Sequence, residues 1–350
     1  MKPLKVFILA VIFITCSIAA YFLVSPGKGE IILERTNFLM GTIVQIKVSI
    51  KGSADRAAAE RAIEKAFEEI SRVEDTFSVF KKDSEVSRIN SLGANETLKI
   101  SDEAFDLIEK AIEYNNKTSG VFDITVKPLV DLWRAAKAAN KLPDEAEIKA
   151  ALARIGSQNI VLDRAGRTIS FKMPGMAIDL GGVAKGYATD RAVKVLKENG
   201  IENAIVNAGG DMYCLGRRSA KVEWNVGIRH PRKKDGVLFR LKLQDKAIDT
   251  SGDYEKYFIL NGRRYSHIID PRTGMPVGDG VVSATVTAGD STTADILATA
   301  LCLLGREGLD TVRSVPGADA LIVLNEGGYL KIEMTEGFER IYGITAKKAL

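Results

Sequence analysis

The chain has 350 residues, 46% of them hydrophobic and 27% charged, which is the composition of a globular protein with one or two domains. Its net charge of +4 is small, and the absence of a basic stripe with interleaved aromatic residues excludes a nucleic-acid-binding protein. Three cysteines and two histidines exclude a disulfide framework, a thiolate metal site and a multi-histidine metal centre within one chain.

The first predicted element is an apolar segment at the N-terminus. Residues 6–24 carry no charge and, as a helix, would span about 28 Å, close to the thickness of the hydrocarbon core of a membrane. Lys2 and Lys5 precede this segment, so we expect its first end in the cytoplasm and the rest of the chain on the periplasmic or outer side. We therefore predict a single-pass anchor in the inner membrane over residues 1–25. A signal peptide cleaved near Ala19 and Ala20 is the alternative.

A linker at 26–30 and one domain at 31–345 are expected to follow. Strands are predicted at 31–33 and 42–50, and helices at 54–76, from 101 onward, at 126–139 and at 144–155. Further along, helices are predicted at 183–199 and 292–304, among short strands at 160–163, 168–172, 203–207, 222–229, 237–243, 256–260, 281–288, 318–324 and 329–333. Because helices come first and antiparallel-type strands later, the order indicates an α+β fold.

A glycine turn opens the helix predicted at 183–199. The segment reads Asp179-Leu-Gly-Gly-Val-Ala-Lys-Gly186, so Lys185 lies in the first helical turn. The N-terminus of a helix offers unpaired N–H groups and a partial positive charge, and glycines let a phosphate approach the backbone. The segment therefore predicts phosphate binding. A plain strand-to-helix turn with a solvated lysine is the alternative, since the spacing matches neither a P-loop nor a dinucleotide fingerprint.

A carboxylate and a hydroxyl share one face of the helix predicted at 292–304. Asp295 and Thr299 are four residues apart, and their hard oxygen atoms suit Mg²⁺ or Ca²⁺. The alternative is structural: Thr292 and Asp295 have the spacing of a helix cap, and Thr299 could bond the backbone.

Two further side chains are candidates for chemistry. His267 ends an apolar strand just before the turn at 270–274, and the only other imidazole, that of His230, lies in a polar loop. This placement favours His267 as a general base, although a lone histidine is more often structural. Asp123 lies in an apolar setting, where a carboxylate is costly unless it is hydrogen-bonded.

Taken together, these segments resemble the ApbE-type FAD:protein FMN transferases. The matching segments, in chain order, are 40–42, 84–90, 120–129, 179–186, 207–211, 251–255, 266–271 and 294–299, within a resemblance that covers 31–340. The resemblance implies an ApbE-like, T-fold-like arrangement of antiparallel sheets with packed helices. It also implies an enzyme that binds FAD with Mg²⁺, moves the FMN half to a threonine or serine hydroxyl of a partner protein, and releases AMP. FAD is then a substrate, and the partners are subunits of Nqr-type and Rnf-type membrane redox complexes.

The resemblance also implies roles for particular residues. Contacts to FAD fall on Met40, Val79, Phe80, Lys81, Val121, Phe122, Asp123, Asp179, Lys185 and His267. The metal ligands are the main-chain carbonyl of Gly182 and the side chains of Asp295 and Thr299. His267 is expected to be the catalytic base, with an aspartate as the alternative. An Mg²⁺-dependent FAD pyrophosphatase that yields FMN and AMP, and a non-catalytic flavin-binding protein, are the competing functions.

Overall fold

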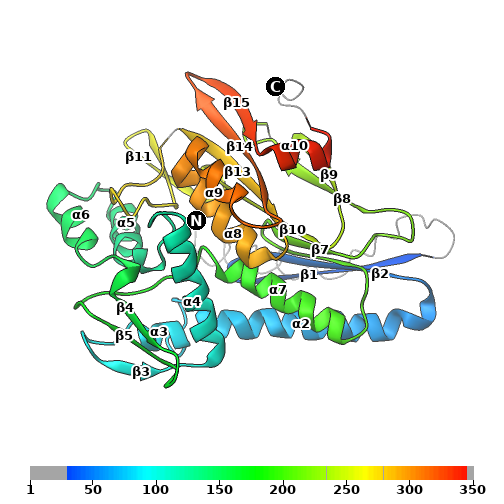
Figure 1. The fold of residues 1–350 in the computed structure, drawn as a ribbon, viewed down its shortest axis with the longest axis horizontal. Helices are drawn as coiled ribbons and strands as arrows, with labels where there is room; N and C mark the ends of the chain where they lie inside the picture. Colours follow the sequence, from blue (N-terminus) through cyan, green and yellow to red (C-terminus); the bar gives the residue numbers. More distant parts are fainter. Residues whose placement is uncertain (1–29, 234, 279, 345–350) are drawn as a thin grey trace, which may run out of the picture.

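A computed structural model describes residues 30–344 except 234 and 279 (Figure 1). An eight-stranded antiparallel sheet lies at its centre. In spatial order its strands are β1 (Ile31–Leu39), β2 (Thr42–Ile50), β6 (Ala204–Ala208), β7 (Asp211–Leu215), β10 (Lys246–Gly252), β13 (Val281–Ala288), β14 (Asp319–Glu326) and β15 (Tyr329–Met334). The smaller sheets of the described chain are β3 (Thr97–Lys99), β5 (Thr168–Phe171) and β4 (Ile160–Asp163), and the hairpins β8 (Trp224–Arg229) with β9 (Val237–Leu243) and β11 (Tyr257–Leu260) with β12 (Arg263–Ser266).

The large sheet is covered on both faces. On one face pack the helices α2 (Arg56–Phe77), α7 (Ala184–Glu198), α8 (Ser291–Leu304) and α9 (Gly308–Arg313) (Figure 1). On the other pack the β8–β9 hairpin and α10 (Glu336–Tyr342). Neighbouring residues of one strand face opposite sides, so Val206 of β6 belongs to the core under the helices and Ile205 to the core under the hairpin. The remaining helices are α3 (Glu85–Ile89), α4 (Asp102–Lys117), α5 (Lys127–Ala139) and α6 (Glu145–Leu152).

The predicted α+β class with antiparallel sheets is confirmed, but several elements escaped prediction. β1 continues six residues beyond the predicted end at 33, and β3, β7, β10, α3, α9 and α10 were not predicted. β10 shows the reason most clearly. Its sequence, Lys-Ala-Ile-Asp-Thr-Ser-Gly, has a buried carboxylate in the middle of a central strand, which hides the hydrophobic pattern by which a strand is recognised.

The predicted membrane localisation is corrected. Within residues 30–344 no helix is both long and apolar enough to cross a bilayer. The apolar helix α8 has only 14 residues, and the longer α2 carries charges along its length. The single-pass anchor predicted at 1–25 falls outside the described residues, so a domain on the periplasmic or outer side has no support. The bounds 1–25, 26–30 and 31–345 stay predictions.

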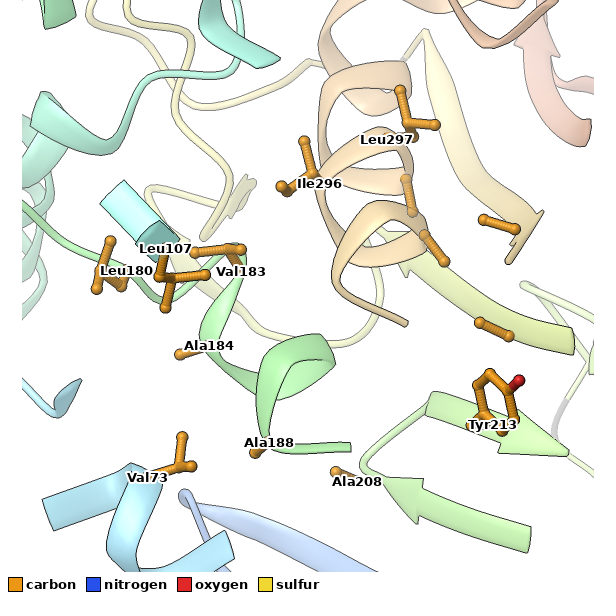
Figure 2. Packing of buried hydrophobic residues seen from close by; sticks show 14 of the residues in the cluster. Val73, Leu107, Leu180, Val183, Ala184, Ala188, Ala208, Tyr213, Ile296 and Leu297 are labelled. Atoms are coloured by element: carbon orange, nitrogen blue, oxygen red, sulfur yellow. The ribbon is translucent and has the colours of Figure 1, made fainter. Parts of the chain in front are cut away.

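The start of α7 is packed among several elements (Figure 2). Figure 2 shows Val183, Ala184 and Ala188 near Val73 of α2, Leu107 of α4 and Ile296 of α8, all members of the main core. α7 and α8 are in close contact at Gly186. A Cβ atom there would lie 2.4 Å from the carbonyl oxygen of Ser291 and 2.9 Å from the Cβ of Asp295. Only glycine fits this contact without moving one of the two helices.

We expect Gly186→Ala to destabilise the fold by about 1–3 kcal/mol, because the added methyl group meets backbone rather than a flexible side chain. The loss should appear as a lower midpoint in urea-induced unfolding at an unchanged slope. Gly289→Ala, just before α8, is the matched control, since a Cβ there meets no atom within 4 Å. Equal stability of the two variants would contradict the close contact.

Candidate active site

Ten of the thirteen predicted site residues line one cavity of about 370 Å³. The cavity lies where segments far apart in sequence meet: the turn after β1, the stretch before α5, the start of α7, the chain after β10 and β12, and one face of α8. The predicted residues that line it are Phe80, Val121, Phe122, Asp123, Asp179, Gly182, Lys185, His267, Asp295 and Thr299. The geometry thus brings the proposed phosphate, metal and base positions into one space.

Met40, Val79 and Lys81 do not line this cavity, although Thr42 and Phe80 beside them do. Met40 has a positive φ of 54° in the tight β1–β2 turn, and its N–H donates to Glu74 Oε2 at 2.9 Å. Lys81 forms an ion pair with Asp75. The structure therefore places these three residues at the edge of the site, and their contact with FAD stays a prediction.

The glycine turn before α7 has the conformation expected from its sequence. Asp179 accepts a hydrogen bond from the Gly181 N–H at 2.8 Å, and burial raises the pKa of this carboxyl group. α7 begins at Ala184, so Lys185 is in its first turn. However, the Lys185 ammonium is not simply solvated: it forms an ion pair with Asp211 and lies 3.8 Å from Asp295 Oδ2.

Three buried carboxylates surround this ammonium group. Asp211, Asp249 and Asp295 are each at most 2% exposed, and one oxygen atom from each lies within 4.8 Å of the others. Burial, reinforced by the charges of the neighbouring carboxylates, raises the pKa of Asp249 and of Asp295. Burial alone would lower the pKa of Lys185, but the attraction of Asp211 and its neighbours outweighs it and raises that pKa. Oδ1 of Asp211 and Oδ2 of Asp249 have no hydrogen-bond partner among the described residues.

Asp295 and Thr299 face the cavity from α8, and neither caps the helix. The N-cap is Asp290, which accepts from the Thr293 N–H at 2.9 Å, so the capping interpretation of Thr292 and Asp295 is wrong. Asp190 of α7 accepts from the N–H groups of Ser291 and Thr292, at 2.7 and 2.8 Å. Asp295 instead accepts from the Gly186 N–H at 3.1 Å. Gly182 is close to the same face, because a Cβ built on it would lie 3.7 Å from Thr299 Oγ1.

His267 is held with one ring nitrogen engaged. Its Nδ1 lies 2.9 Å from the carbonyl oxygen of Lys256, which can only accept, so Nδ1 carries the proton and Nε2 is left as an acceptor. His267 is exposed at the mouth of the site, and the partial desolvation of its ring by the surrounding residues lowers its pKa to about 4, with the charges of Lys256 and Lys185 adding to the effect, so the imidazole is neutral at pH 7. Glu255 lines the same cavity, and burial raises its pKa to about 7.

Other residues of the lining are apolar or aromatic, or are polar with their hydrogen bonds satisfied. Phe80 is 76% exposed, and the Arg134 guanidinium lies 4.9 Å from the centre of its ring. Asp123 accepts from the Thr125 N–H at 2.8 Å and from the Ser157 hydroxyl at 2.7 Å, which offsets the cost of placing a carboxylate there. An aromatic ring system could pack against these apolar and aromatic side chains.

Comparison with known proteins identifies the family of this chain. A model of the ApbE family matches residues 40–322. The chain belongs to the ApbE family. A FAD:protein FMN transferase of Vibrio cholerae is 37% identical over 77% of this chain and 80% of its own, and one of Treponema pallidum is 33% identical over 83% and 84%. The crystal structure of the ApbE protein of Thermotoga maritima superposes with a TM-score of 0.79 at 38% identity, over 89% of this chain and 99% of that one.

The ApbE resemblance is thus confirmed. However, the sequence analysis gave no role to four residues that lie in or beside the cavity. Asp211 and Glu255 lie in segments that carry the resemblance, so the motifs 207–211 and 251–255 could have drawn attention to them. Arg134 lies within a predicted helix without a motif. Asp249 had no signal at all, since β10 itself was not predicted.

Lys185→Ala should weaken FAD binding about tenfold, the loss expected for one charge-assisted hydrogen bond. It should also destabilise the protein by about 3 kcal/mol, because it leaves Asp211 buried without its counter-charge. Isothermal titration with FAD and urea-induced unfolding measure the two effects. Lys185→Met with Asp211→Asn is the matched variant: it should recover stability but not FAD affinity. An unchanged dissociation constant in both variants would contradict phosphate binding by Lys185.

Proposed function

We propose that this chain, an FAD:protein FMN transferase like its curated relatives, uses Mg²⁺ to move FMN from FAD to a threonine or serine hydroxyl of its acceptor protein and releases AMP. The observation that carries the proposal is the single cavity that collects Gly182, Lys185, His267, Asp295 and Thr299. The proposed acceptors are subunits of Nqr-type and Rnf-type redox complexes, a choice supported by the family resemblance alone.

The donor atoms of the site fit Mg²⁺. The Asp295 carboxylate and the Thr299 hydroxyl line one cavity with the backbone of Gly182, and all three supply hard oxygen ligands. Asp211 Oδ1 and Asp249 Oδ2, which are buried without a hydrogen-bond partner among the described residues, are further oxygen atoms that a cation would stabilise. When bound, the metal ion neutralises part of the charge that develops on the diphosphate during phosphoryl transfer.

The protein's own groups account for the remaining steps. The N-terminus of α7 and the Lys185 ammonium bind phosphate oxygens, and the wall with Phe80 orients the flavin. The acceptor hydroxyl oxygen forms a bond to the phosphorus of the FMN half, while the bond from that phosphorus to the bridging oxygen breaks and AMP leaves with the electron pair. The proton of the hydroxyl passes to Nε2 of His267, which is unprotonated at neutral pH.

The proposal is tested by incubating the protein with FAD, Mg²⁺ and a purified acceptor subunit of an Nqr-type reductase. Flavin that remains attached to a threonine or serine after denaturation, with one AMP released per flavin attached, supports transfer. Free FMN and AMP without labelled acceptor would favour the pyrophosphatase alternative. Transfer that continues undiminished in EDTA would contradict the role of the metal.

A further inference from the structure

A second cavity, of about 620 Å³, borders the candidate active site. We call it the basic groove, and its lining comes from the loop between β8 and β9, from the chain after β10 and from β12. The residues used below are Arg229, Lys233, Tyr254, Tyr257 and Arg264.

The walls of the basic groove are fixed by polar contacts. His230 Nδ1 accepts from the N–H groups of Arg232 and Lys233, both at 3.1 Å, which holds the loop in a tight turn. The Arg232 guanidinium makes two hydrogen bonds to Asp253, at 2.8 and 2.6 Å, and Asp253 is only 8% exposed. This bidentate pair ties the loop to the chain after β10, so the groove is preorganised for a partner.

The lining of the basic groove has an excess of positive charge. Arg229, Lys233 and Arg264 form no ion pair within 4 Å with any described residue, and Asp235 is the only acidic residue in the described lining. Arg264 lies 4.4 Å from the centre of the Tyr257 ring. Arginine and tyrosine side by side are typical of protein-binding surfaces. No helix N-terminus contributes to the lining, unlike at the phosphate position of the active site.

One short segment separates the basic groove from the active-site cavity. Tyr254 and Tyr257 line the groove, whereas Glu255 and Lys256 between them line the cavity that contains His267. The two cavities therefore lie on either side of the four-residue segment 254–257, within the span of one extended polypeptide. This nearness to the candidate active site distinguishes the groove from an ordinary basic surface patch.

We infer that the basic groove binds an acidic segment of the acceptor protein, next to the threonine or serine that receives FMN. The inference rests on the proposed function and adds the chemistry by which the acceptor is recognised. Complementary charge increases the rate of encounter and sets the orientation, and the aromatic rings provide contact area for the peptide.

Two synthetic peptides test this inference with the full-length, FAD-loaded protein. Each carries one threonine, flanked in one peptide by six glutamates and in the other by six lysines, and binding is followed by fluorescence anisotropy. We expect the acidic peptide to bind at least about tenfold more tightly at low salt, with a preference that shrinks as ionic strength rises. Arg229→Glu with Arg264→Glu should abolish the preference. Arg61→Glu, an exposed reversal on α2 that lines neither cavity, should preserve it.

Equal binding of the two peptides, or a preference that survives the double reversal, would overturn the inference. The inference would also be overturned if the wild-type protein bound a second equivalent of AMP and the double variant did not. The groove would then be a nucleotide site. The readouts separate this inference from the proposed function. If the wild-type protein and the double variant label an acceptor equally well, only the docking inference fails. If no acceptor is labelled while FAD is hydrolysed, the proposed transfer fails.

Discussion

Asp295→Ala should lower the rate of FAD turnover by about 100-fold or more, because it removes a carboxylate proposed to hold the divalent cation at the diphosphate. The measurement is AMP release with FAD in excess. A metal-binding titration without FAD gives a second readout, in which Mg²⁺ affinity should fall in parallel. Turnover above a tenth of the wild-type rate would contradict the role of Asp295.

Asp295→Asn is the matched control, because it keeps the shape of the side chain and removes its charge. Burial and neighbouring carboxylates raise the pKa of Asp295, so the folded state favours the protonated form. Without metal, the wild-type free energy of unfolding should therefore fall as pH rises above the ordinary range of an aspartate. Asp295→Asn should weaken this fall. The variant would then be inactive yet at least as stable as the wild type at pH 8, which separates loss of chemistry from loss of fold.

His267→Ala should slow FMN transfer by about 10²- to 10⁴-fold, the usual contribution of a general base. FAD binding should change much less, since the proposed phosphate contacts are made by other groups. Transfer rates at saturating FAD, and FAD affinity measured by flavin fluorescence, provide the two readouts. Equal losses of rate and affinity would show that His267 positions FAD instead of accepting a proton.

The pH profile identifies which group is the base. A base must be unprotonated, so activity is lost as pH falls through its pKa. With a pKa of about 4, His267 predicts a transfer rate that is nearly constant from pH 8 down to pH 5 and falls below it. Glu255, with a pKa of about 7, would instead give a fall near neutrality. Glu255→Gln should leave the wild-type profile unchanged if His267 is the base.

How much the sequence could predict depended on whether a signal was local. α7 and α8 were predicted with their site residues in place, because a glycine turn and helical spacing are local signals. The partners of those residues come from elsewhere. Lys185 is paired with Asp211 from a neighbouring strand, and the N–H groups of Ser291 and Thr292 at the start of α8 donate to Asp190 of α7. Contacts of this kind depend on how the elements pack, which a single sequence does not reveal.

The buried carboxyl groups beside the active-site cavity affect the order in which ligands arrive. Asp211, Asp249 and Asp295 surround the Lys185 ammonium at a depth where water screens charge poorly, and of the three only Asp295 lines the cavity. A dinucleotide already complexed with a divalent cation brings the positive charge that lets these buried carboxyl groups ionise, whereas a bare dinucleotide brings only negative charge. FAD and its cation should therefore be taken up together, and mixing protein with flavin in a chelating buffer should leave most of the flavin in solution.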